Sequence, residues 1–219
     1  MEHISRQLID DCLKPKVWDL GNETLYRLCE NHFDHSSAEK IIAKTWLIGR
    51  SYSVSLERVR EKKKISDNFY TDFVVPHFKN SELDNLLNTV KYLPCSVENS
   101  FEILNVHNSL TKLINVFTEM NKRSFASKYL HFHLPVTFFI YDTRAVQALK
   151  KFVPALPDDL KGYSKNFNFD KKYTDFYFRC LHLQKRIATE QKIILSPREI
   201  DNLLLEYSNK LTNNSSKTR

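Results

Sequence analysis

The sequence predicts an all-α protein, and three observations lead to this expectation. Apolar residues recur at helical spacing, most clearly Leu110, Leu113, Ile114 and Phe117 at positions i, i+3, i+4 and i+7. Serine and aspartate residues precede several apolar stretches, as is typical of helix N-caps. Only 3 of the 219 residues are glycine, too few for a turn-rich β fold. Because 42% of the residues are hydrophobic, such helices can bury a core.

The first well-marked helix begins after Ser36. Ser36 and Glu39 match a capping box, in which the two side chains satisfy free amides of the first turn. Apolar residues continue through Ile48, and the helix is expected to stop near Gly49. A strongly basic run at 58–64 suits the C-terminal end of a second helix. That second helix is expected to carry Val54, Leu56 and Val59.

Three further helices are expected in the middle of the chain. Ser81 begins one that ends before Pro94. The apolar stripe described above defines the next, and a break at 120–123 separates it from a third helix over residues 124–133. Pro135 ends that third helix, because proline cannot continue the helical hydrogen bonds. Aromatic residues of this region are expected in the core: Phe125, Tyr129, Phe132, Phe138 and Phe139.

Asp142 follows a short apolar stretch at 136–141 and is the expected N-cap of another helix. Residues 154–168 are polar and contain prolines, and we expect a loop there, followed by a helix over 170–189. The helix after Asp142 is expected to bury Ala145, Leu149 and Phe152.

The last helix has a complete start signal, with Ser196 as N-cap, Pro197 at the first helical position and Glu199 at the third. We expect residues 1–212 to form a single globular domain and residues 213–219 a disordered tail. One face of the last helix should carry Ile200, Leu203, Leu204 and Tyr207.

Composition excludes several classes of protein. A glycine-rich phosphate loop and a dinucleotide-binding fingerprint need glycines close together, whereas Gly21, Gly49 and Gly162 are far apart. No Cys-x-x-Cys pair occurs, so neither a disulfide framework nor a zinc site is expected, and we expect no metal or cofactor. Buried, reduced thiols are instead predicted for Cys12, Cys29, Cys95 and Cys180.

The expected location is the cytoplasm. No apolar run reaches the length of a membrane span, and the N-terminus lacks the pattern of a secretory signal. We therefore expect a cytoplasmic protein without a membrane partner, most simply a monomer.

The net charge of +7 favours an acidic partner. Lys122 and Arg123 stand at the start of the helix over 124–133, whose first amides are free to bind a phosphate. Ser124 belongs to the same turn, and Lys128 lies one turn further along. These residues predict a contact with nucleic acid, and DNA is the expected partner.

The stretch from Asn121 to Ala148 combines a basic turn, a helix, an apolar connector and a carboxylate that begins another helix. Together with Ile-Tyr-Asp-Thr-Arg at 140–144, this order resembles the helix-hairpin-helix DNA glycosylase superfamily, whose catalytic segment reads roughly Val-Asp-Thr-His. The resemblance implies a two-lobed helical fold that binds DNA across its cleft. It assigns to Asp142 the catalytic carboxylate, which stabilises a sugar cation and helps water to attack C1′.

The resemblance extends back to the Ser36 helix. Residues 47–52 fall where the family carries a segment that wedges into the gap left by the flipped base. The implied base pocket contains Tyr52, Glu57, Arg58 and His131. The implied DNA contacts are Arg50, Lys122, Arg123, Ser124, Lys128 and Arg144. Glu57 and Arg58 also fit an ordinary helix surface, and His131 also fits a packed core.

Two departures from the family shape the expected activity. The family's hairpin is glycine-rich, whereas residues 120–123 contain no glycine. Members that cleave the DNA strand carry a lysine nucleophile where this chain has Ser124, so a monofunctional enzyme is expected. One alternative is a non-catalytic DNA-binding or interaction module in which Asp142 is only a helix cap. Another is a glycosylase that acts in defence against modified phage DNA.

Overall fold

The computed structural model describes residues 1–59, 67–166 and 168–217. The chain is 68% helical, and no β-strand occurs in the described ranges, which confirms the all-α class. None of the described helices is both long and apolar enough to cross a bilayer.

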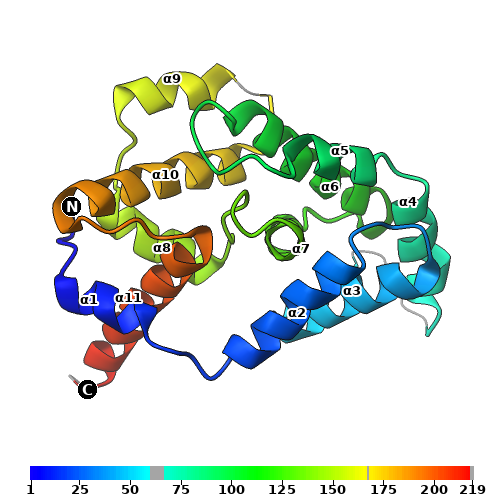
Figure 1. Ribbon diagram of the computed structural model, residues 1–219, viewed down its shortest axis with the longest axis horizontal. Coiled ribbons are helices and arrows are strands. Elements are labelled where there is room, and N and C mark those ends of the chain that lie inside the picture. The colour runs from blue at the N-terminus through cyan, green and yellow to red at the C-terminus, as the bar shows by residue number, and fades with distance from the viewer. Residues whose placement is uncertain (60–66, 167, 218–219) are drawn as a thin grey trace.

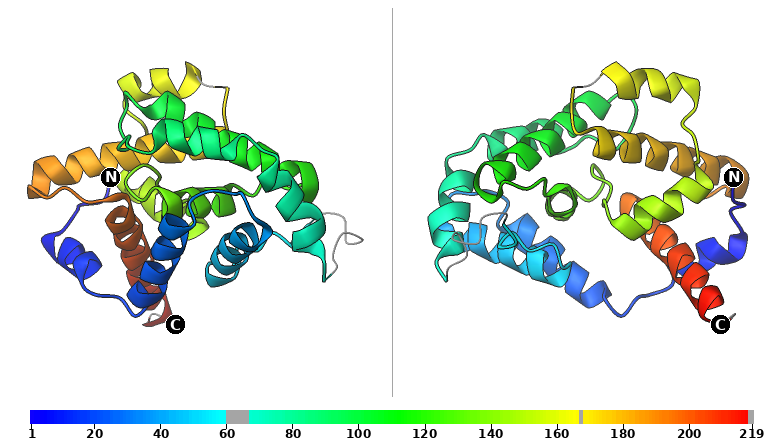
Figure 2. Two further views of the ribbon diagram at one scale, coloured as in Figure 1. Left: turned by 45° about the vertical axis from the view of Figure 1, so that its right-hand side comes forward. Right: turned by 180° about the vertical axis from the view of Figure 1, so that it is seen from behind.

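The helices of the middle part of the chain pack around α7 (Arg123–His133), which is buried from Phe125 to its end. Figures 1 and 2 show α7 near the centre of the molecule. Its neighbours in contact are α2, α3 and α6, and α5 packs on α6. These surrounding elements are α2 (Asp19–Asn31), α3 (Ala38–Ser51), η2 (Tyr70–Val74), α4 (Val75–Lys79), α5 (Leu83–Val90) and α6 (Ser100–Thr118).

The two ends of the chain meet in a second group of helices. The last helix, α11, packs on both α1 and α8, so the first and last helices lie side by side (Figure 1). Helix α10 packs on α8 and α9. This group consists of α1 (Arg6–Leu13), α8 (Thr143–Phe152), α9 (Asp158–Asn166), α10 (Lys171–Gln191) and α11 (Pro197–Lys217).

Buried apolar side chains run through both groups of helices, from Ile4 in the N-terminal segment to Leu204 on α11. The aromatic residues expected in the core are at most 1% exposed, which confirms their assignment: Phe125, Tyr129, Phe132, Phe138 and Phe139. The thiols of Cys12, Cys29 and Cys180 are free and buried, whereas that of Cys95 is only partly buried.

The expected end of α3 near Gly49 is confirmed to within two residues. The helix continues past Gly49 to Ser51, and its side-chain cap is Ser37, one residue later than expected, with Oγ accepting from Lys40 N at 3.4 Å. Gly49 allows a close approach instead, because a Cβ there would lie 3.3 Å from the Ser55 Cα. Ser53 has a left-handed φ of 53°, which turns the chain back along α3.

This turn also explains why the helix expected to carry Val54, Leu56 and Val59 does not form. Residues 52–59 make turns and irregular backbone, with the Val54 amide bonded to the Gly49 carbonyl at 2.9 Å. The basic run expected to end that helix lies outside the described residues from position 60 to 64.

The loop expected over 154–168 is also wrong, since it contains α9. Asp158 and Asp159 occupy the first turn, where carboxylates interact favourably with the helix dipole, and the buried Leu160 anchors the helix. By contrast, the helices expected around Leu86, Ile114, Ala145 and after Ser196 are all confirmed. Helix α11 continues to Lys217, into the segment expected as a tail, and residues 218–219 lie outside the described part.

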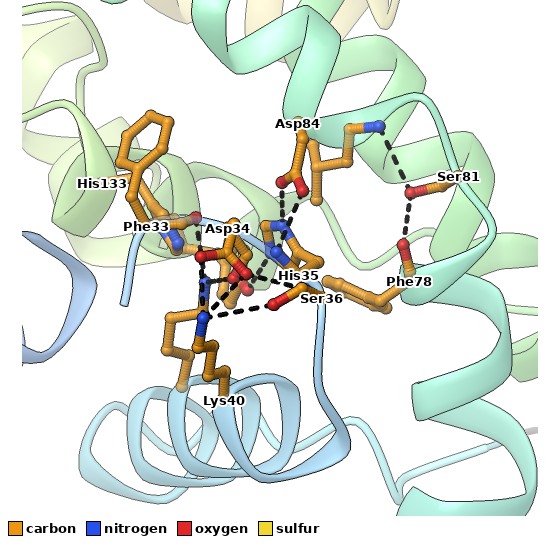
Figure 3. A network of polar contacts seen from close by, with 12 residues as sticks. Phe33, Asp34, His35, Ser36, Lys40, Phe78, Ser81, Asp84 and His133 are labelled. Atoms are coloured by element: carbon orange, nitrogen blue, oxygen red, sulfur yellow. Dashed lines mark hydrogen bonds and ion pairs between the residues drawn. The ribbon is translucent and has the colours of Figure 1, made fainter. Parts of the chain in front are cut away.

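A buried polar network ties the loop between α2 and α3 to two other helices (Figure 3). His35, which is 2% exposed, bonds through Nδ1 to Asp84 on α5 and through Nε2 to the Tyr129 hydroxyl on α7 at 2.6 Å. Lys44 on α3 donates to the carbonyl oxygens of Phe33 at 3.1 Å and Asp34 at 2.9 Å. Burial lowers the pKa of His35, which keeps its ring neutral despite the nearby carboxylate.

Candidate active site around Asp142

The turn between α6 and α7 closes without glycine. Glu119 adopts the left-handed conformation, with a φ of 56°, that a glycine would adopt at lower cost. The Thr118 hydroxyl supports the turn by accepting from the Met120 amide at 3.3 Å. No side chain caps α7 at Lys122, although Asn121 Oδ1 accepts from the Arg123 amide at 3.2 Å. The turn thus presents the start of α7 without a dedicated cap.

Asp142 is the N-cap of α8, as the sequence predicts. Its Oδ1 accepts from the Arg144 amide at 2.9 Å, and its side chain remains 34% exposed. Ala145, Leu149 and Phe152 bury one face of α8 and so fix the position of this helix start. The carboxylate is therefore held in place at a side chain that remains partly exposed.

Lys128 on α7 reaches the same point. Its Nζ lies 3.6 Å from Asp142 Oδ2, donates to Ser124 Oγ at 2.8 Å and donates to the Tyr141 carbonyl at 3.0 Å. The side chain is only 2% exposed, and burial lowers the pKa of its amine. The structure thus brings together three residues that the sequence singles out: Ser124, Lys128 and Asp142.

The structure also has a cavity of about 490 Å³, a volume within the range of about 300–1,000 Å³ typical of small-ligand pockets, and neither Asp142 nor Lys128 is among its lining residues. Tyr52 lines it and connects it to the catalytic candidate, because Lys128 Nζ lies 5.8 Å from the Tyr52 ring centroid. Its walls come from the connector before α2, from α2, from the end of α3 and from α11: Lys16, Val17, Trp18, Asp19, Gly21, Asn22, Leu25, Ser51, Tyr52, Arg198, Asp201, Asn202 and Leu205.

Two charged residues of the cavity wall, Arg198 and Asp201, escaped the sequence analysis. Arg198 Nη1 lies 3.4 Å from Asp201 Oδ2, and both side chains are largely buried, with exposures of 19% and 4%. The guanidinium also lies over the rings of Tyr26 at 5.7 Å, Tyr52 at 5.9 Å and Phe132 at 5.4 Å. One sequence signal could have revealed the carboxylate, because Asp201 interrupts the buried stripe of Ile200, Leu203 and Leu204.

The charge of Asp142 affects the pKa of Asp201 in the cavity wall. Burial raises the pKa of the Asp201 carboxyl to about 6, and the negative charge of Asp142 adds to the rise. The cations Arg198, Lys128 and Arg144 act in the opposite direction. The same few charges therefore act on both the cavity and the catalytic candidate.

His131 lies behind the cavity wall rather than in it. Its ring is fully buried, with Nδ1 facing the Phe138 carbonyl at 2.8 Å and Nε2 facing the Tyr26 hydroxyl at 2.7 Å. Tyr26 in turn accepts from Arg198 Nε at 2.9 Å. His131 thus packs in the core and supports Arg198 through Tyr26.

Glu57 and Arg50 meet at a different place from Tyr52. They form an ion pair with each other, and Glu57 also accepts from the Ser55 hydroxyl and from the Tyr70 hydroxyl at 2.8 Å. The nearby Arg58 is exposed, and its carbonyl accepts from Lys122. Of the four expected base-pocket residues, Tyr52 alone is in the wall of the cavity described above.

The cations expected to contact DNA are engaged within the protein. Lys122 donates to the Ser55 carbonyl at 3.0 Å, and burial lowers the pKa of its amine to about 8. Arg123 makes a bidentate pair with Asp170, with both distances at 2.6 Å. Arg144 donates to Asn209 and to Ser208 Oγ, the latter at 3.4 Å. A phosphate would therefore have to share or replace these internal partners.

Comparison with known proteins found no matching protein-family model, no similar curated protein and no matching solved structure.

Proposed function

We propose that this protein is a DNA N-glycosylase that removes a damaged or modified base, with Asp142 as the catalytic carboxylate. The observation that carries the proposal is the position of Asp142: it is one-third exposed, fixed at a helix start and 3.6 Å from a buried ammonium, which itself lies 5.8 Å from the ring centroid of the cavity-lining Tyr52. An enzyme that acts on a base within DNA needs such a pocket for the extruded nucleotide and a charge beside its sugar.

In the proposed reaction, the pocket binds the extruded base and the carboxylate acts on its sugar. The extruded base enters the cavity, and its sugar C1′ faces Asp142. As the C1′–N bond breaks, the base leaves with the bonding electrons, and the negative carboxylate stabilises the cationic sugar. Water then adds to C1′, and its proton passes through Asp142 or solvent to the departing base, which leaves an abasic site and a neutral free base. Lys128 orients the carboxylate through its contact with Oδ2.

We propose hydrolysis without strand cleavage. The Lys128 amine is 2% exposed and has three oxygen neighbours, a setting that suits a fixed ammonium rather than an attacking amine. Its lowered pKa is the observation in favour of a second route, in which Lys128 attacks C1′ and forms a Schiff base. The two routes give different products, so they can be separated by experiment.

The proposed binding mode has two helix groups on either side of the DNA. The group around α7 supplies the turn between α6 and α7, whose uncapped helix start can bind a phosphate together with Lys122, Arg123 and Ser124. The group around α11 supplies Asp142 and the far wall of the cavity. In this arrangement the fold is a two-lobed, helix-hairpin-helix type of glycosylase.

A panel of duplexes tests the function. Each duplex carries one modified base, including oxidised, deaminated, alkylated and hypermodified phage-type bases, and alkali after incubation cleaves any abasic site. Release of free base from at least one duplex, detected by mass spectrometry, is the expected result. DNA binding without release from any member would favour a non-catalytic module, and release of a phage-type base alone would favour a defence role.

A further inference from the structure

Two side chains of the cavity wall carry buried polar atoms for which the described part of the fold supplies no partner. Among the described residues, Asp201 Oδ1 and Arg198 Nη2 are buried and form no hydrogen bond within the protein. Both belong to side chains of the cavity wall, and both are part of one ion pair. Buried polar atoms are almost always paired, so the unpaired donor and the unpaired acceptor of this ion pair point to a bound group that completes them.

The chemistry of the two side chains defines what that group must offer. An ionised carboxylate only accepts hydrogen bonds, and a guanidinium only donates them. The bound group must therefore present an N–H toward Asp201 and, next to it, an acceptor toward Arg198. Trp18, which is 74% exposed at the cavity rim, and Tyr52 supply aromatic faces that suit a planar ring.

We propose that Asp201 and Arg198 recognise a base with a lactam edge, in which a ring N–H stands beside a carbonyl, as in hypoxanthine, guanine or uracil. This inference rests on the proposed function and names the class of base that the cavity takes. A carbonyl oxygen has two lone pairs for the guanidinium, and a lactam N–H is a strongly polarised donor to a carboxylate. An edge with an amino group and a bare ring nitrogen, as in adenine, offers a weaker donor and a weaker acceptor to these two charges.

Nucleoside binding tests the inference without requiring excision. In a Trp46→Phe background, Trp18 is the one remaining tryptophan and reports directly on the cavity rim. Its fluorescence is titrated with 2′-deoxyinosine and 2′-deoxyadenosine, which share a purine ring and differ at the edge. Deoxyinosine is expected to bind at least tenfold more tightly.

Three controls assign the preference to the proposed contacts. A 1-methyl group on deoxyinosine removes the N–H, and this ligand is expected to lose the tenfold advantage with the protein unchanged. Asp201→Asn should abolish the preference for deoxyinosine, because an amide can both donate and accept. Asp175→Asn on α10 removes one negative charge from a residue outside the cavity wall and is expected to leave the preference unchanged.

The outcomes separate this inference from the proposed function. Equal affinity for the two nucleosides, undiminished binding of the 1-methyl derivative, or no binding of either nucleoside would overturn the lactam proposal, even if a modified duplex is excised. Selective binding of deoxyinosine that requires Asp201, with no excision of any duplex, would support the pocket and count against the glycosylase.

Discussion

Asp142 can serve the fold and the reaction with different parts of one carboxylate. Oδ1 accepts from the Arg144 amide and caps α8, whereas Oδ2 lies toward Lys128. Its role as N-cap is predictable from the sequence, because an aspartate between an apolar stretch and a helical stripe is a local signal. The partner Lys128 is harder to predict, since its position depends on how α7 and α8 pack.

The position of the ion pair of Arg198 and Asp201 in a cavity wall cannot be predicted from the neighbouring residues in the sequence. Their sequence neighbours indicate only a helix with one apolar face, and nothing local indicates that α2 and α3 close a cavity over them. The burial that raises the pKa of Asp201 comes from residues distant in sequence. The family resemblance assigns both Tyr52 and Glu57 to a base pocket; Tyr52 lines the cavity, whereas Glu57, which follows the turn at Ser53, accepts from the Tyr70 hydroxyl.

The role of Lys128 distinguishes simple hydrolysis from a reaction through a Schiff base. With a duplex that the enzyme processes, borohydride is expected to trap no protein–DNA adduct, because hydrolysis forms no Schiff base. Gel electrophoresis of the borohydride-treated mixture provides the measurement. A trapped adduct that disappears in Lys128→Ala but persists in the exposed-lysine control Lys150→Ala would show instead that Lys128 is the nucleophile.

At the scale of helices, the elements with both an apolar stripe and an end signal were predicted best. Helix α11 is an example: the Ser196 amide donates to Glu199 Oε2 at 2.7 Å, and the Glu199 amide donates to Ser196 Oγ at 3.3 Å, as a capping box requires. Helix α9 was missed because prolines and polar residues obscured its short apolar face. It forms because Leu156 and Leu160 find a buried surface, which is a tertiary effect.

The turn between α6 and α7 carries the prediction about DNA binding. Changing both Lys122 and Arg123 to Ala should weaken affinity for any duplex, whatever its sequence. The slope of log affinity against log salt should fall in magnitude by about 0.9 for each lost phosphate contact. Affinity is measured by fluorescence anisotropy at several salt concentrations.

A matched control distinguishes the turn from general charge. Lys150 and Lys151 lie in the last turn of α8, and changing both to Ala removes the same charge from another element. This control should change the slope less. An unchanged slope in the Lys122 and Arg123 double variant, with its fold verified by circular dichroism, would place the DNA contact elsewhere.

For the molecule as a whole, buried neutral histidines predict how stability depends on pH. Burial lowers the pKa of the four buried histidine rings, to about 3 for His107 and below the usual value for His35, His131 and His133. It also lowers the pKa of the half-buried His182. Unfolding exposes these rings, which then bind protons near pH 6.5, so the unfolded state binds more protons below that pH. Stability is therefore complete above about pH 6.5 and falls as the pH decreases.

The Asp201 carboxyl changes the dependence of stability on pH in the opposite direction to the histidines. Its pKa is raised to about 6, so its contribution is favourable at low pH and is lost as the pH rises through about 6. Four histidines outweigh this single carboxyl. Urea unfolding at pH 7.5, 6.5 and 5.5 should show a decreasing free energy of unfolding, with a slope of up to about 1.4 kcal/mol per pH unit for each histidine. A constant free energy over this range would contradict the buried, neutral state of these rings, and the exposed-residue control His32→Gln should leave the slope unchanged.

The central claim is that the negative charge of Asp142 drives base excision, and single-turnover excision by Asp142→Asn tests it most directly. Asparagine caps helices about as well as aspartate, so this variant should stay folded and bind DNA, whereas Asp142→Ala should lose about 1 kcal/mol of stability. Loss of the charge beside the sugar cation should slow excision of the substrate duplex about a hundredfold or more, which corresponds to about 3 kcal/mol. Excision by a folded, DNA-binding Asp142→Asn variant at the wild-type rate would contradict the account.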